Sequence, residues 1–362
     1  MTSVGILSLA TYLPQGLRTN DWWGLPPTTP SGDSGGPTPR NHFDAAMQPY
    51  IDDPFFGSVE RRVAAQGETS LSLGAQAATR ALTAAGLEPG DIDGLIAVSM
   101  FPDRVGSGDA GYLAKELGTG GGAFNVEATC SGSLSALLTA CALVRSGLKK
   151  RVLVVATSML ARAIDADDVT LRLCGDAAGA IVVGEVEEGF GLLGAKTLNT
   201  SETCGTWMMD TVEDGSGTTA GGRRIRLRVD PSIAHVLRYT AEPFLLKTVD
   251  GALEAAGATR DDVAAFIVNT PTAWHADFSA RALKVASERV VDTFPRVANI
   301  GPVLMPFNAF TAASQGLIKP GDLTVLYTFG GQAEAGAAVF RWSDTALAPE
   351  PEQATVLNAP RL

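Results

Sequence analysis

Residues 84–99 read AAGLEPGDIDGLIAVS, and residues 255–270 read AAGATRDDVAAFIVNT. Each stretch contains the end of an Ala-rich helix, a Gly that stops it, an acidic turn and an apolar run typical of a buried strand. The stretches lie 171 residues apart, and the same separation aligns VLVVAT at 152–157 with LTVLYT at 323–328. Two matches at one separation indicate two similar halves with a duplicated βαβ architecture.

Segments outside the repeat define the expected domain boundaries. We expect an N-terminal half over residues 1–196, with a loop insertion at 24–56 that begins in a Pro/Gly/Ser-rich stretch. A connecting loop over 197–224 leads to a C-terminal half over 225–342. The Pro-rich tail, 343–362, is expected to pack poorly.

Composition limits the class of protein. The chain has 362 residues, of which 45% are apolar, and this suits a large globular α/β unit. Its net charge of −11 argues against general nucleic-acid binding. No apolar run reaches the roughly 18 residues of a membrane span. The apolar start lacks a basic region, so it indicates a first strand rather than a signal peptide, and we expect a cytoplasmic protein.

One of the four cysteines stands at an unusual junction. In AFNVEATCSGSLSALL, residues 123–138, an apolar, strand-like segment runs into Cys130 and then into a helix. The positive end of a helix dipole favours a thiolate, so Cys130 is a candidate nucleophile. From position alone, a buried and inert thiol is the alternative. Cys141 has helical spacing typical of the core, Cys174 and Cys204 are interpreted as structural, and no CxxC spacing indicates a metal site.

The repeat also relates two distant points of the chain. The residue 171 positions after Cys130 is Gly301, which follows Asn299 by two residues. Equivalent points of a pseudo-twofold fold can meet at its centre, so we expect Cys130 and Asn299 to approach each other.

Longer motifs connect these observations to a known family. NVEATCSGSLSAL around Cys130, GDAAGAIVVG at 175–184 and IKPGDLTVLYTFGGQAEAGAAVFRW at 318–342 resemble segments of the ketoacyl-acyl-carrier-protein synthase III family, within the thiolase superfamily. The resemblance covers most of residues 3–342. It implies an α/β, thiolase-like five-layer αβαβα fold, usually dimeric, that moves acyl groups through a cysteine thioester.

The resemblance assigns roles to individual residues. Cys130 is the implied nucleophile, and its backbone N–H together with that of Gly331 forms the implied oxyanion hole. Asn299, with Pro306 seven residues on, matches the family's Asn–Pro spacing. This sequence departs from the family at the His position, where an ungapped alignment places Thr270. His275, five residues later, is the candidate base.

A displaced His changes the expected chemistry. Condensing enzymes use His and Asn to support decarboxylation of a malonyl thioester, whereas acyl transfer needs the Cys, the oxyanion hole and a base. We therefore favour an acyltransferase of polyketide or other secondary-metabolite biosynthesis, with no cofactor other than an acyl-CoA or acyl-carrier-protein thioester as substrate. The alternatives are decarboxylative Claisen condensation with malonyl-acyl carrier protein and a non-catalytic partner of the same fold.

The expected partners follow from the same resemblance. The positions of the family's coenzyme A adenine clamp read Ile51, Phe55 and Val169, so the clamp is predicted to be missing. RRIRLR at 223–228 and KKR at 149–151 could dock an acidic carrier protein, although the alternation in RRIRLR also suits a solvent-facing strand. A homodimer is expected, paired through the strand around 122–128.

Overall fold

The computed structural model describes residues 2–25, 38–165, 168–213, 223–331, 333–351 and 354–358. Two sheets form the framework of this part of the chain. The six-stranded sheet has the order β14-β1-β7-β6-β4-β5. Its strands are β1 (Val4–Tyr12), β4 (Gly94–Met100), β5 (Gly122–Asn125), β6 (Val152–Met159), β7 (Asp176–Glu185) and β14 (Ala346–Leu347). The four-stranded sheet has the order β11-β12-β13-β8. Its strands are β8 (Gly191–Asn199), β11 (Val263–Val268), β12 (Leu323–Phe329) and β13 (Glu334–Arg341).

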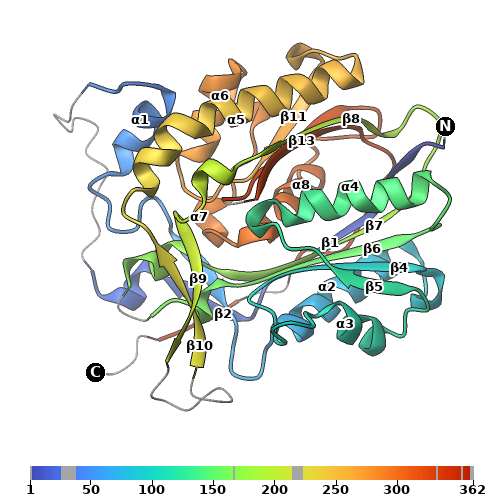
Figure 1. The fold of residues 1–362 in the computed structure, drawn as a ribbon, viewed down its shortest axis with the longest axis horizontal. Helices are drawn as coiled ribbons and strands as arrows, with labels where there is room; N and C mark the ends of the chain where they lie inside the picture. The colour runs from blue at the N-terminus through green and yellow to red at the C-terminus, as the bar shows by residue number, and fades with distance from the viewer. Residues whose placement is uncertain are drawn as a thin grey trace.

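Helices separate and cover the two sheets. Figure 1 shows α4 (Gly132–Arg145) and α8 (Leu304–Ser314) between the sheets. The outer face of the six-stranded sheet carries α2 (Ser70–Ala85) and α3 (Ala110–Leu117), and that of the four-stranded sheet carries α5 (Ile233–Ala256) and α6 (His275–Leu283). These are the five layers of the αβαβα fold predicted from the sequence.

Three apolar clusters fill the spaces between the layers. The central cluster combines residues of α4 and α8 with residues from both sheets, such as Leu137, Phe307 and Ile267. A second cluster joins α2 to the six-stranded sheet, and a third joins α5 and α6 to the four-stranded sheet. Apolar burial on both sides of each sheet explains why the strands are continuous apolar runs rather than alternating ones.

The duplication predicted from the repeat is visible in the topology. The strand series β1-β7-β6-β4 and β8-β13-β12-β11 have the same relative directions: two antiparallel pairings followed by a parallel one. Helices α2 and α5 end at Ala85 and Ala256, and each is followed by a left-handed Gly. These ends, and the starts of β6 and β12, are separated by the 171 residues found in the sequence.

The halves meet at a different place from the predicted boundary. Strand β8 pairs with β13 in the second sheet, so the predicted boundary at residue 196 falls inside β8. The segment 197–224, expected as a connecting loop, contains the end of β8, strand β9 (Trp207–Glu213) and the start of β10 (Arg223–Val229), although 214–222 lie outside the described residues. Strands β9 and β10 pair antiparallel. The alternation in RRIRLR suits a strand with one face in solvent.

The tail also differs from expectation. Strand β14 pairs with β1 at the edge of the large sheet, and β15 (Thr355–Val356) pairs with β2 (Gly16–Thr19), which also pairs with β3 (Glu60–Val63). Backbone pairing with exposed sheet edges therefore orders part of a segment that was expected to pack poorly. In the insertion, 26–37 lie outside the described residues, and α1 (His42–Met47) packs on α5 and α6. A short α7 (Phe294–Val297) precedes the Asn299 loop.

Candidate active site

Cys130 lies in a tight turn between β5 and α4. A single 3-10 turn, Thr129–Ser131, leads directly into the helix, so the thiol lies at the helix N-terminus as predicted. Thr129 has a φ of 48°, in the left-handed region that a β-branched residue rarely adopts. A Cβ at Gly132 would lie 2.5 Å from the Val98 side chain, so the turn is packed against β4. The backbone around Cys130 is therefore strained and held by its surroundings.

The loop after β12 holds the other side of this turn. The Thr129 hydroxyl donates to the Gly331 carbonyl oxygen at 3.1 Å. A Cβ at Gly330 would lie 2.5 Å from the Ala128 carbonyl oxygen, whereas a Cβ at Gly331 would meet nothing within 4 Å. Gly330 is thus required for the close approach of the two backbones, and Gly331 borders open space.

Two backbone N–H groups are available at this junction. Within the described part of the chain, neither the Gly331 N–H nor the Cys130 N–H donates to a carbonyl oxygen. The Gly330 N–H, in contrast, donates to the Glu334 carbonyl oxygen at 2.9 Å. The Cys130 and Gly331 amides are the pair predicted as the oxyanion hole, and that role stays a prediction.

Burial dominates the ionisation of the thiol. Burial raises the pKa of Cys130 to about 12, and the residue's own backbone N–H lowers the pKa by a smaller amount. Among the described residues, no charged side chain contributes to this shift. Burial therefore opposes the expected preference for the thiolate and favours the neutral thiol.

The Asn299 loop reaches the neighbourhood of Cys130, as the repeat predicts. Asn299 forms a β-bridge with Cys174, which belongs to the apolar cluster that Cys130 contacts. The short turn that follows Asn299, Gly301–Val303, contacts the Cys130 turn. The Asn299 Oδ1 accepts from the Gly301 N–H at 2.9 Å. Its Nδ2 has no partner within the described chain, so this amide remains a free donor.

The two candidates for the family's His position are held by other residues. Thr270 is fully buried, and its hydroxyl accepts from the Asn308 Nδ2 at 3.3 Å. His275 is the first residue of α6, and its Nδ1 forms a hydrogen bond with the Thr272 hydroxyl at 2.7 Å. The His275 ring lies edge-on to Phe43 and Phe278, and burial lowers its pKa to about 4. These contacts hold the His275 side chain between Phe43 of α1 and two residues of its own segment, Thr272 and Phe278.

Asn269, which the sequence analysis did not single out, contacts the nucleophile residue directly. Its Nδ2 donates to the Cys130 carbonyl oxygen at 3.2 Å. The signal was present in the alternation of β11: Ala265 and Ile267 belong to the central core, whereas Phe266 and Val268 belong to the outer one. Continuing that alternation by one step turns Asn269 toward the layer that contains Cys130.

Apolar side chains surround the thiol on its other side. Cys130 packs against a cluster that also receives the partly buried Trp23 and Trp207. The buried members are Met100, Leu160, Ala163, Ile164, Leu171, Cys174 and Leu227. Next to this cluster, a groove of about 390 Å³ runs along the ends of β4 and β5, past Thr129, to Met209 and Ile225 of the β9–β10 hairpin. The hairpin therefore borders both the cluster and the groove.

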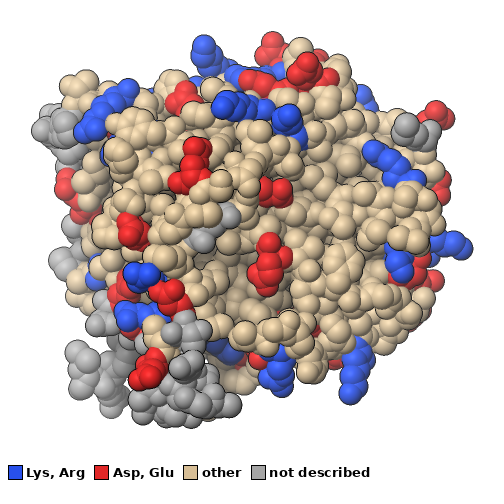
Figure 2. Space-filling view, viewed as in Figure 1, with Lys and Arg blue, Asp and Glu red and all other residues tan. Residues whose placement is uncertain are grey.

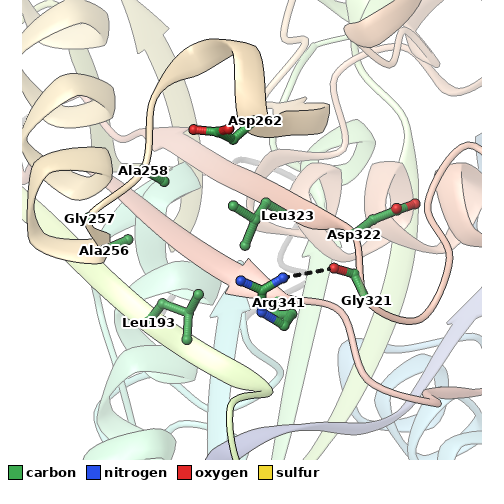
Figure 3. Close-up of a pocket in the computed structure, with 9 residues that line it drawn as sticks. All are labelled: Leu193, Ala256, Gly257, Ala258, Asp262, Gly321, Asp322, Leu323 and Arg341. Atoms are coloured by element: carbon green, nitrogen blue, oxygen red, sulfur yellow. Dashed lines mark hydrogen bonds between the residues drawn. The ribbon is translucent and has the colours of Figure 1, made fainter.

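A second hollow, of about 420 Å³, lies away from this site. Figure 3 shows Leu323 and Arg341 at its wall, near Gly257 at the end of α5. Leu323 begins β12, whereas Gly330 and Gly331 follow the end of that strand. A strand of this length spans roughly 20 Å, so the hollow is at the opposite end of the sheet from Cys130.

Within the described ranges, no group of three or more His, Cys, Asp or Glu side chains is arranged to hold a metal ion. The same part of the chain contains no helix that is both long and apolar enough to cross a membrane.

Comparisons with known proteins agree with the fold and the Cys130 segment. The family described as 3-oxoacyl-[acyl-carrier-protein (ACP)] synthase III matches residues 124–201, and its C-terminal domain matches 253–342. A beta-ketoacyl-[acyl-carrier-protein] synthase III of Brucella suis is 35% identical over 291 residues, which cover 79% of this chain and 88% of the relative. The chain belongs to the 3-oxoacyl-[acyl-carrier-protein] synthase III family of thiolase-fold enzymes.

Solved structures give the same result. A 3-oxoacyl-[acyl-carrier-protein] synthase III from Aquifex aeolicus is similar with a TM-score of 0.77 and 25% identity, covering 94% of this chain and 100% of that one. A synthase III from Thermus thermophilus has a TM-score of 0.76 and 27% identity, covering 94% and 99%. The resemblance stated from the motifs is confirmed.

Proposed function

We propose that the protein is an acyltransferase of the ketoacyl synthase III type that forms an acyl thioester on Cys130. It then passes the acyl group to an acceptor without decarboxylative condensation. The observation that carries this choice is that an amide side chain, rather than an imidazole, contacts the backbone of Cys130. The Asn269 amide contacts its carbonyl, and the Asn299 loop lies next to its turn. His275, meanwhile, is hydrogen-bonded to Thr272 and packed on Phe43.

Amide and backbone N–H groups suit acyl transfer. The Cys130 and Gly331 N–H groups can stabilise the oxyanion of a tetrahedral intermediate, and the Asn299 Nδ2 can donate to the thioester carbonyl. Decarboxylation of a malonyl thioester benefits from a His beside the same carbonyl, and Thr270 stands at that place in the alignment. Decarboxylative condensation is the second candidate, because the Brucella suis relative is named as a beta-ketoacyl synthase.

The acyl group suited to this site is apolar. The cluster around Cys130 consists of aliphatic, sulfur-containing and indole side chains, which favour a hydrocarbon chain. No cofactor is needed, since acylation exchanges one thioester for another. We place the reaction in polyketide or other secondary-metabolite biosynthesis in the cytoplasm.

The acyl donor is an acyl-CoA, an acyl carrier protein or both. Of the three positions that match the family's adenine clamp, Ile51 and Val169 are exposed, and Phe55 is buried against Trp23. They offer no planar cation for stacking an adenine.

The two basic clusters give little support for carrier-protein docking. Arg226 pairs with Asp165 and Arg228 with Asp210, while the Arg223 and Arg224 side chains lie outside the description. KKR at 149–151 follows the C-terminal end of α4, roughly 20 Å from Cys130 by helix length. On the face shown in Figure 2, Lys and Arg are interspersed with Asp and Glu rather than gathered in one patch.

We also propose a homodimer. In the described sheet, β5 is an edge strand that pairs only with β4, and its Phe124 is exposed. Tyr112 on α3 and Val105 are exposed as well. Edge strands with apolar side chains are covered in stable proteins, so a second copy is the proposed occupant.

Mass spectrometry of the intact protein separates the two candidate functions. The protein is incubated with acyl-CoA, malonyl-CoA and the corresponding acyl-carrier-protein thioesters, and released carbon dioxide is measured in parallel. Acyl transfer predicts a stable acyl adduct and no carbon dioxide from any malonyl thioester. Carbon dioxide release that depends on Cys130 would favour condensation instead.

A further inference from the structure

The Asn269 side chain combines a satisfied donor with an orphaned acceptor. Its Nδ2 donates to the Cys130 carbonyl oxygen at 3.2 Å, and because a carbonyl only accepts, the orientation of the amide is determined. The other amide atom, Oδ1, is buried and has no hydrogen-bond partner among the described residues. Only 3% of the residue is exposed. An unpaired buried acceptor of this kind is unfavourable, so its presence indicates a partner that binds there during the reaction.

The position of the orphaned oxygen relates it to the reaction. The two terminal atoms of an amide are close neighbours, so Oδ1 lies near the backbone of Cys130, the residue that carries the thioester. Three unpaired donors lie at this site: the N–H groups of Cys130 and Gly331, and the Asn299 Nδ2. Donors suit the acyl carbonyl. An acceptor suits a group that carries its own proton.

We infer that Asn269 Oδ1 binds the acyl acceptor by accepting a hydrogen bond from its attacking hydroxyl or amine. This inference rests on the proposed acyl transfer through Cys130. In the transfer step, a bond forms between the acceptor's oxygen or nitrogen and the acyl carbon, and the carbon–sulfur bond to Cys130 breaks. The acceptor's proton passes to the departing sulfur and regenerates the thiol. No oxidant, metal or further reactant is required.

The backbone supports a fixed position for this oxygen. The Asn269 N–H donates to the Tyr327 carbonyl oxygen at 3.1 Å, which continues the pairing of β11 with β12 by one residue. Both ends of the residue are thus tied, one to the sheet and the other to Cys130. Thr270, the next residue, has its hydroxyl bound to Asn308 and does not replace Asn269 in this role.

The test uses the acyl-enzyme, isolated before the acceptor is added. Wild type, Asn269→Leu and Asn269→Asp are each acylated and then mixed with 1-pentanol, 1-pentylamine or 1-pentanethiol. Loss of the acyl group is followed by intact mass. A thiol is a weak hydrogen-bond donor, so it serves as the matched control acceptor. Only the acylated fraction of Asn269→Leu is used. Its acylation shows that the variant is folded and that Cys130 still reacts.

We expect Asn269→Leu to slow transfer to the alcohol or the amine about 100-fold more than it slows transfer to the thiol. The two oxygen- and nitrogen-containing probes show which acceptor class the site prefers. Asn269→Asp retains the acceptor oxygens, so it should transfer within tenfold of wild type once acylated, even if its acylation is slower. Acyl-enzyme that forms in Asn269→Leu and transfers at the wild-type rate would overturn the inference. So would a wild type that accepts only the thiol. Failure to form any acyl-Cys130 would instead refute the proposed function.

Discussion

Thr129 and Gly331 are joined by a hydrogen bond of 3.1 Å that ties the residue before the nucleophile to the loop after β12. This bond connects the two halves of the duplicated fold at the point where the thiol lies. It also brings the second candidate oxyanion donor, the Gly331 N–H, to the same junction. The strained φ of Thr129, 48°, is maintained by this contact from the opposite half.

The first prediction concerns the backbone contact at Gly330. In Gly330→Ala, the new Cβ would lie 2.5 Å from the Ala128 carbonyl oxygen, which is a backbone atom that cannot easily move. We expect a loss of roughly 1–3 kcal/mol in the free energy of unfolding and a strong reduction in the rate of Cys130 acylation. Gly331→Ala is the control, because its Cβ meets open space and its N–H is retained. Chemical denaturation and acylation kinetics check both. Equal behaviour of the two variants would be inconsistent with the contact.

The second prediction concerns the buried His275. Its pKa is lowered to about 4, from about 6.5 in an unfolded chain, because burial disfavours the charged ring. The unfolded state therefore binds the proton first. The contribution of the neutral ring is complete above pH 6.5 and is lost as the pH falls toward 4. His275→Gln should remove this dependence, which amounts to about 3 kcal/mol.

The difference in the free energy of unfolding between wild type and His275→Gln separates the effect of His275 from that of other titrating groups. Burial raises the pKa of Asp176 to about 6, so that carboxyl acts in the opposite direction over part of the same range. Denaturant unfolding of wild type and His275→Gln from pH 7.5 to pH 4 gives the difference curve. We expect it to change with the sign given above, and a flat curve would contradict the buried neutral ring.

The third prediction concerns the homodimer. Phe124→Asp places a charge on the exposed edge strand β5, so it should weaken self-association by roughly 2 kcal/mol or more. Tyr239→Asp is the control, because Tyr239 is exposed on α5. Sedimentation equilibrium measures both variants. A wild type that stays monomeric at micromolar concentration would argue against pairing through β5.

Much of the fold could be predicted because the repeat carries a physical regularity. Helix ends, left-handed glycines and buried strands recur at 171 residues, and α2–β4 and α5–β11 follow that pattern. The predicted boundary at residue 196 falls inside β8, because the few buried positions of this strand give no signal for its extent. Strand β9 was assigned to the connecting loop, because the Gly/Ser/Thr-rich residues that follow it in the sequence are typical of a loop, whereas the alternation in RRIRLR already suited the strand β10.

The site was predictable in its backbone and less so in its side chains. Cys130 at the start of α4 follows from local sequence, and the approach of the Asn299 loop follows from the duplication. The position of Asn269 depends on which face of β11 turns inward, which the alternation indicates only once the central layer is known. Thr270 is bound by Asn308 of α8, 38 residues away, and the His275 ring packs on Phe43 of α1, in the insertion. Such distant contacts leave no local pattern.

Peptide mapping of the acylated protein tests the central claim most directly. Wild type, Cys130→Ala and Cys141→Ala are incubated with an acyl-CoA and an acyl-carrier-protein thioester, and the site of added acyl mass is determined. We predict one acyl group on Cys130 in wild type and in Cys141→Ala, because Cys141 is buried in the core of α4, and none in Cys130→Ala. Acylation of equal extent in Cys130→Ala would contradict the account.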